Sequence, residues 1–180
     1  MSALTILGAT GGVGATTVAA LALHALGSRG SRLPVVMSVD RPALEARLGA
    51  RITAPRYSTH EVGDGGRFAP ADASETLENG FLCLVSAATP LGDAHASALL
   101  RRAKAEIGTA SLERLVIVRN GATGPSRGRP DLPAWARRLD IPFDRALADH
   151  PDVTTASGSL SRRTRTAVAA WSQLVHRIVG

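Results

Sequence analysis

One stretch near the start of the chain, residues 4–17 with the sequence LTILGATGGVGATT, constrains the fold more than any other. A short apolar run leads into a cluster of glycines, and a long aliphatic segment, residues 16–26, follows it. Glycines allow a tight turn and the close approach of an anion, and the N–H groups at the start of a helix point toward whatever lies in the turn. The stretch therefore predicts a strand, an anion-binding loop and a helix.

The glycine cluster resembles the deviant Walker A loop of the MinD/ParA family of P-loop ATPases, whose pattern is Lys-Gly-Gly-x-Gly-Lys-Thr-Thr. The residues that match the pattern are Gly11, Gly12, Val13, Gly14, Thr16 and Thr17. Thr10 stands where the family has its signature lysine, and Ala15 stands where it has its phosphate-binding lysine. The resemblance is to a degenerate member of the family that lacks both lysines.

This resemblance implies that residues 11–17, Ala15 included, bind the phosphates of ATP or ADP, and that the Thr16 hydroxyl ligates Mg²⁺. Losing a charged hydrogen-bond partner costs on the order of 1.5–3 kcal/mol per contact. We therefore expect a pseudo-ATPase or a very slow ATPase, with a pocket that holds no nucleotide as the limiting case. The family also forms homodimers, in which the signature lysine crosses to the nucleotide of the partner subunit. Thr10 replaces that lysine here, so a homodimer of this chain would lack the contact that links the family's ATP-driven dimer.

A second interpretation of the same glycines stays open. Gly8, Gly11 and Gly14 have the G-x-x-G-x-x-G spacing of NAD(P)-binding short-chain and NmrA-like dehydrogenases. Classical short-chain enzymes need a tyrosine with a lysine four residues later, whereas Tyr57 and Lys104 are far apart in this chain. This separation excludes the classical mechanism and leaves a non-catalytic dinucleotide sensor as the alternative.

Length and composition favour one α/β domain over residues 1–180. A chain of 180 residues with 44% hydrophobic residues can bury a single core but is short for two domains. The net charge of +6 favours partners that carry phosphate, such as DNA. The sequence has a single cysteine, Cys83, and lacks an apolar stretch of transmembrane length, so we expect a cytoplasmic protein.

Apolar runs alternate with helical patterns along the rest of the chain. Strands are predicted over residues 33–39, 81–85, 115–118 and 140–144, and helices over residues 17–26, 70–77, 91–107, 132–139 and 161–179. The polar run 58–62 is assigned as a strand on the family resemblance alone. Such alternation predicts a three-layer domain like that of P-loop NTPases, with helices on both faces of a mostly parallel sheet.

Three polar residues are expected beyond the carboxyl ends of these strands, where ligands bind in this fold class. In the MinD/ParA family, an aspartate at the position of Asp40 lies near the attacking water, and Asp64 would be the Walker B carboxylate that holds Mg²⁺ together with Thr16. Asn120 would contact the adenine base. A simpler interpretation makes Asp40 a helix cap and places Asp64 and Asn120 in Asp-Gly and Asn-Gly turns.

The helix predicted over residues 161–179 has one apolar stripe, which can pack on the sheet or lie on an anionic membrane. We favour packing, because the family ends its domain with such a helix. The resemblance implies a spatial organiser or adaptor in DNA partition, division-site placement or pilus positioning, with a protein partner. The alternative is a non-enzymatic module that binds DNA without sequence preference through Arg101, Arg102, Arg162, Arg163 and Arg165.

Overall fold

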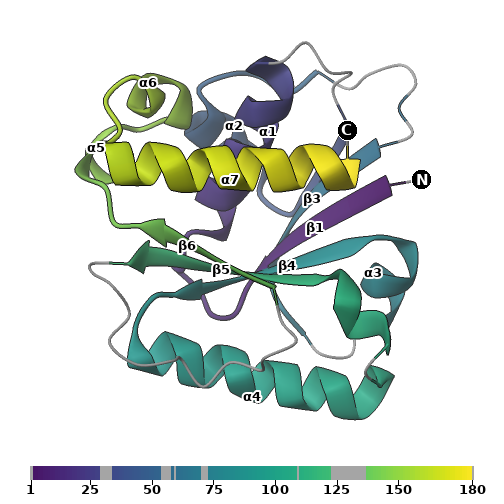
Figure 1. Ribbon diagram of the computed structural model, residues 1–180. Helices are drawn as coiled ribbons and strands as arrows, with labels where there is room; N and C mark the ends of the chain where they lie inside the picture. The colour runs from purple at the N-terminus through teal and green to yellow at the C-terminus, as the bar shows by residue number, and fades with distance from the viewer. Residues whose placement is uncertain are drawn as a thin grey trace.

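Parallel strands form the middle layer of the molecule (Figure 1). The computed structural model describes residues 2–28, 34–53, 58, 60–69, 73–108, 110–122 and 137–179. Its strands are β1 (Ser2–Gly8), β2 (Val35–Ser38), β3 (His60–Arg67), β4 (Phe81–Ala87), β5 (Leu115–Ala122) and β6 (Arg137–Pro142). They pair in the order β2-β3-β1-β4-β5-β6, and every pairing is parallel.

Helices cover both faces of this sheet, so the predicted three-layer α/β architecture is confirmed. One face carries α1 (Ala15–Ser28) and α7 (Arg162–Val179); α2 (Arg41–Leu48) and α6 (Val153–Ser157) pack beside α1, and α5 (Arg145–Asp149) packs beside α6. The other face carries α3 (Ala73–Asn79) and α4 (Pro90–Ile107), with the short 3-10 helix η2 (Ala110–Arg114).

The two central strands are buried from both sides, which explains their nearly continuous apolar sequences. Ile6 of β1 and Val85 of β4 belong to the core cluster beneath α1 and α7. Leu7 and Leu84, their neighbours in sequence, belong to the cluster beneath α3 and α4. Side chains alternate between the two faces of a strand, so one sheet serves two cores.

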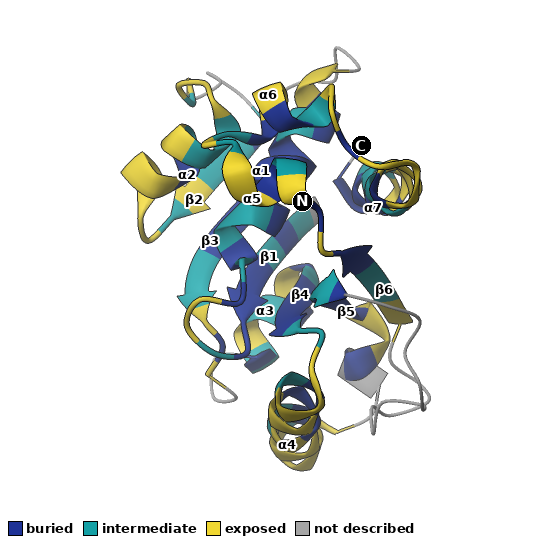
Figure 2. Cartoon of the chain, turned by 90° about the vertical axis from the view of Figure 1, so that its left-hand side faces the viewer, coloured by how far each residue is buried: buried dark blue, intermediate teal, exposed yellow. Residues whose placement is uncertain are grey.

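The C-terminal helix packs on the sheet, as predicted. Trp171 of α7 is fully buried, and its indole N–H donates a hydrogen bond to the Val18 carbonyl of α1 at 3.3 Å. The exposed residues of α7 and α4 lie on the outer sides of the two helical layers (Figure 2). Among the described helices, none is long and apolar enough to cross a membrane.

Two predicted turns prove to be parts of strands. β3 runs on through the Asp64-Gly65 pair, because Asp64 is paired with β1 on one side and with β2 on the other. β5 likewise runs through Asn120-Gly121, with φ of +81° at Gly121 and a shift of register against β6. The Asp-Gly and Asn-Gly turn interpretations are therefore wrong, because pairing with neighbouring strands overrides the local turn preference.

The helix predicted over residues 132–139 is wrong in its described part. Residues 137–139 belong to β6, where Arg137 and Leu139 pair with Val116 and Val118 of β5. Residues 132–136 lie outside the described residues, as does Tyr57. β6 ends at Pro142, and Asp144, predicted to end this strand, instead caps α5 by accepting a hydrogen bond from the Ala146 N–H at 2.9 Å.

Candidate functional site

The glycine loop joins the end of β1 to the first turn of α1, as predicted. Its φ angles are +74° at Gly12 and +85° at Gly14, in the left-handed region that favours glycine. A cavity of about 340 Å³ opens beside it. The cavity is lined by Gly8, Thr10, Gly11, Gly12, Val13, Gly14, Ala15, Thr16, Asp64, Gly66 and Arg67. The first N–H groups of a helix have no partner within it, so this cavity can accept an anion.

Thr16 and Asp64, predicted to act together, are in contact beside the loop. Asp64 is only 2% exposed, it lines the same cavity as Thr16, and the Thr16 hydroxyl is close enough to lower the pKa of its carboxyl. Burial raises the pKa of Asp64, as does the nearby charge of Asp40, while hydrogen bonds from Thr16 and from the Gly66 N–H oppose the rise. The ionised form of Asp64 is thus disfavoured in the free protein and would be favoured by a bound cation.

This pair of oxygen donors fits Mg²⁺. Mg²⁺ is usually bound by one or two carboxylates, with water and substrate phosphates completing its octahedral coordination. Thr16 and Asp64 supply a hydroxyl and a carboxylate at the edge of the cavity. No group of three or more His, Cys, Asp or Glu side chains gathers in the described part of the chain, so water or phosphate oxygens would supply the remaining ligands of a cation here.

Asp40 serves as the N-cap of α2. Its side chain accepts a hydrogen bond from the Ala43 N–H at 3.1 Å, and its own N–H donates to the Ser38 hydroxyl at 3.2 Å. The helix-cap interpretation of this residue is therefore confirmed. Asp40 also lies close enough to Asp64 for their charges to interact. Its role beside an attacking water stays a prediction.

Asn120 reaches the glycine loop from the end of β5. Its side-chain amide donates a hydrogen bond to the Val13 carbonyl at 3.0 Å. A Cβ atom at Gly14 would lie 2.2 Å from the Asn120 amide nitrogen. Glycine is therefore required at this position both by the φ angle and by the contact with Asn120. Asn120 also lines a second cavity of about 180 Å³, together with Thr17, Arg47, Gly121, Pro142, Phe143, Asp144, Leu147 and Ala148. The structure thus places Asn120 between the glycine loop and a neighbouring pocket.

Three solved structures share this architecture over nearly the whole chain. A ParA family ATPase from Chlorobium tepidum TLS matches with a TM-score of 0.64 and 16% identity over 96% of this chain and 98% of its own. The chain has the ParA/MinD fold. A nucleotide-binding protein from Archaeoglobus fulgidus in complex with ADP matches with a TM-score of 0.55 and 15% identity, over 92% of this chain and 91% of its own. The cell division ATPase MinD of Pyrococcus furiosus matches with a TM-score of 0.51 and 17% identity, over 99% of both chains. No protein-family model and no curated protein sequence matches this chain.

The two lysine positions of the ParA/MinD loop hold no cation here. Ala15 is the first residue of α1 and is buried, and Thr10 is half-buried in the loop. Arg67, at the end of β3, is the cation among the residues that line the loop cavity. The loop therefore has the backbone of an anion site without the side chains that usually complete it.

Arg47, which sequence reasoning missed, forms hydrogen bonds with α1 and with the C-terminal part of this ParA/MinD-like domain. From α2 its Nε atom donates to the Thr17 hydroxyl at 3.0 Å. Its other nitrogens donate to three backbone carbonyls, those of Leu147 at 2.5 Å, His150 at 2.7 Å and Pro151 at 3.2 Å. Burial lowers the pKa of Arg47, and the charge of Asp152 opposes this effect. No local pattern marks Arg47, because its partners lie far away in sequence.

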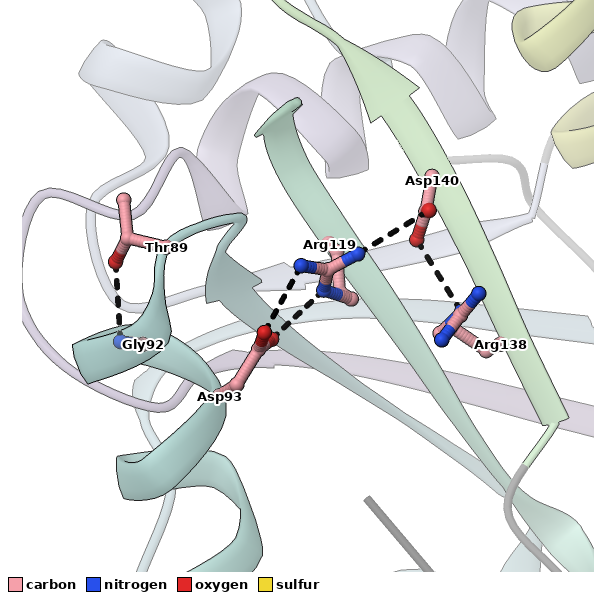
Figure 3. Close-up of polar contacts among 6 residues, drawn as sticks. All are labelled: Thr89, Gly92, Asp93, Arg119, Arg138 and Asp140. Carbon is pink, nitrogen blue, oxygen red and sulfur yellow. Dashed lines mark hydrogen bonds and ion pairs between the residues drawn. The ribbon is translucent and has the colours of Figure 1, made fainter. Parts of the chain in front are cut away.

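An ion-pair network around the buried Arg119, the residue before Asn120, also escaped the sequence analysis (Figure 3). Arg119 forms a bidentate pair with Asp93 of α4, at 2.7 and 2.9 Å, and a third contact with Asp140 of β6 at 3.2 Å. Arg138 approaches the same Asp140 at 3.5 Å. Burial alone would lower the pKa of Arg119, but the two carboxylates raise it overall. The network joins α4, β5 and β6 directly beside the residue that contacts the loop.

Proposed function

We propose that this chain is a degenerate nucleotide-binding protein of the ParA/MinD type that binds ATP or ADP with Mg²⁺ weakly and hydrolyses ATP very slowly or not at all. The observation that carries the proposal is the Thr16–Asp64 contact beside a glycine loop that has no lysine at positions 10 and 15. The phosphates would lie along the loop, with Mg²⁺ between Thr16 and Asp64. The base would lie in the cavity that Asn120 lines.

Slow or absent ATP hydrolysis is expected because the loop lacks both lysines. In phosphoryl transfer the protein stabilises charge on the transferred group, largely with lysine, arginine and metal ions. Mg²⁺ would supply part of that stabilisation, and Asp40 would orient the attacking water. Without lysines at positions 10 and 15, the loop offers the phosphates backbone N–H groups and threonine hydroxyls but no positive charge. Binding is therefore expected to survive better than hydrolysis.

The biological role we propose is that of a spatial organiser or adaptor in DNA partition, division-site placement or pilus positioning. The support is the shared fold with a ParA family ATPase and with MinD, which is named as a cell division ATPase. Such a role depends on a second copy of the chain and on a protein partner. Both partners can be sought by cross-linking and by pull-down with nucleotide present and absent.

Calorimetric titration of the purified protein with ATP, ADP and NADP⁺, each with Mg²⁺ or EDTA, tests the nucleotide proposal. The proposal predicts Mg²⁺-dependent ATP binding without NADP⁺ binding, followed by weak or absent hydrolysis that Asp40→Ala and Asp64→Ala reduce further. Preferential NADP⁺ binding would favour the dinucleotide alternative. The strand order argues against that alternative, because the usual dinucleotide-binding sheet has its second strand beside the first, whereas here β3 lies between β1 and β2.

The five arginines of the DNA-binding alternative do not lie on one surface. Arg101 and Arg102 are exposed on α4, while Arg162, Arg163 and Arg165 are exposed on α7, and these helices cover opposite faces of the sheet (Figure 1). One DNA duplex would therefore contact one of the two groups. DNA binding through α7 alone would be supported by two results: the DNA affinity falls steeply with added salt, and removal of the three α7 arginines abolishes binding.

A further inference from the structure

We propose that Arg67, at the end of β3, supplies the phosphate-binding cation that the glycine loop itself lacks. This inference rests on the proposed nucleotide function and assigns a residue to it. The ligand class is the polyphosphate chain of a nucleoside di- or triphosphate. The cation would come from the strand that also carries the metal-binding carboxylate, and not from the first turn of α1.

The first argument is position. Arg67 lines the same cavity of about 340 Å³ as Gly11, Gly12 and Thr16, and no other lysine or arginine is among its described lining residues. The side chain is exposed, so an incoming anion can reach it from solvent. A phosphate held by the loop would therefore have one permanent positive charge beside it, at Arg67.

The second argument is a shift of strand register that brings Arg67 to this position. Ile6 of β1 pairs with Asp64 of β3, and Gly8 pairs with Arg67, so two steps along β1 correspond to three along β3. Adding one residue to a strand moves the following side chains to its other face. The register shift, next to Gly66 with φ of +76°, therefore turns Arg67 toward the face of β3 that carries Asp64. Such bulges commonly redirect a side chain next to a functional site.

The shifted register is fixed by the backbone. The Phe68 N–H donates a hydrogen bond to the Gly8 carbonyl at 2.9 Å, directly after Arg67. A Cβ atom at Gly8 would lie 2.8 Å from the Thr10 carbonyl oxygen and 3.4 Å from that of Gly66. The end of β3 and the entrance of the loop are thus packed against each other through main-chain atoms. The backbone of Arg67 is therefore held in place beside the loop.

The third argument is that the guanidinium of Arg67 is available to bind a ligand. Within the described part of the chain it takes part in no hydrogen bond or ion pair, whereas Arg47 and Arg119 donate to backbone carbonyls and carboxylates. A guanidinium can donate two parallel hydrogen bonds to a phosphate. One free arginine at the cavity edge can therefore replace part of the charge lost with the lysines.

The test compares wild type with Arg67→Gln and Arg67→Lys, using calorimetric titration with ATP and, separately, with inorganic tripolyphosphate in the presence of Mg²⁺. Arg177→Gln removes an equal charge from the exposed last turn of α7 and is the control. We expect Arg67→Gln to lower the affinity for both ligands about ten- to a hundredfold, because one charge-assisted hydrogen bond is lost. Arg67→Lys should retain part of the affinity, and Arg177→Gln should match wild type.

A compensating variant makes the test sharper. Adding Ala15→Lys to Arg67→Gln restores the lysine of the family pattern, and we expect it to recover binding. Circular dichroism and the unfolding midpoint establish that each variant is folded. Wild-type affinity in Arg67→Gln would overturn the role of Arg67 while the nucleotide proposal stands. Binding of tripolyphosphate through Arg67 without binding of ATP would overturn the nucleotide proposal alone. Failure of wild type to bind either probe would overturn both.

Discussion

Alanine at Gly14 should destabilise the protein more than alanine at Gly11 or Gly12 of the same loop. The left-handed φ of +85° costs an alanine about 1–2 kcal/mol. The new Cβ atom would also lie 2.2 Å from the Asn120 amide nitrogen, displacing that side chain from the Val13 carbonyl. Losing this hydrogen bond costs about 0.5–1.5 kcal/mol. We expect Gly14→Ala to lower the free energy of unfolding by about 1.5–3.5 kcal/mol in total.

Two neighbouring glycines provide matched controls. Gly12 has a φ of +74° but nothing within 4 Å of an added Cβ atom, so Gly12→Ala should cost the backbone strain alone, about 1–2 kcal/mol. Gly11 has neither a left-handed φ nor a neighbour within 4 Å, so Gly11→Ala should change stability by less than about 0.5 kcal/mol. The three variants should therefore rank in the order Gly14, Gly12, Gly11.

Urea unfolding followed by circular dichroism measures these differences. Adding Asn120→Ala to Gly14→Ala removes the displaced amide, so the double variant should lose less stability than the two single variants together. An equal loss for Gly11→Ala and Gly14→Ala would refute the explanation from φ and contact. Strict additivity in the double variant would refute the contact with Asn120.

Three further outcomes follow from buried charges. Arg119→Met leaves Asp93 buried without its bidentate partner and should cost about 3–5 kcal/mol in urea unfolding, with Asp93→Leu in the same chain recovering part of the loss. Burial raises the pKa of Asp64, so its ionisation destabilises the folded protein as pH rises from the ordinary carboxyl pKa through the raised one. Asp64→Asn should thus stabilise the nucleotide-free protein more at pH 7 than at pH 4.5, and an equal effect at both values would contradict this. Arg47→Ala should lower the unfolding midpoint by removing hydrogen bonds to Thr17 and to three carbonyls, and an unchanged midpoint would show that water replaces them.

The loop and α1 could be predicted because their signals are local. The apolar run of β1, the glycines and the aliphatic helix are adjacent in sequence, and each residue type has a direct conformational reason to be there. The buried strands β4 and β5 were equally clear for the same reason. Asp64 was placed beside Thr16 only through the family resemblance, because the run from Gly63 to Gly66 has the composition of a turn.

The parts that sequence did not predict depend on distant partners. The strand predicted over residues 140–144 overlaps β6, but residues 137–139, predicted as helix, also belong to β6 because they pair with β5. Arg119 finds Asp93 and Asp140 at separations of 26 and 21 residues, and Arg47 finds the Leu147 carbonyl 100 residues away. In an arginine-rich chain, no single arginine is distinguished by its neighbours in sequence. Tertiary contacts alone identify which of them are structural.

The central claim, that Thr16 and Asp64 hold Mg²⁺ against a phosphate in the glycine loop, is tested most directly by the coupling between Mg²⁺ and ATP. The measurement is the ratio of ATP affinity with Mg²⁺ to that with EDTA, in wild type and in Thr16→Val. Wild type should bind ATP about fivefold or more tightly with Mg²⁺, and the ratio should fall toward one in the variant, as expected for a coupling of about 1–3 kcal/mol. A ratio of one in wild type, or a ratio that Thr16→Val leaves unchanged, would contradict the account.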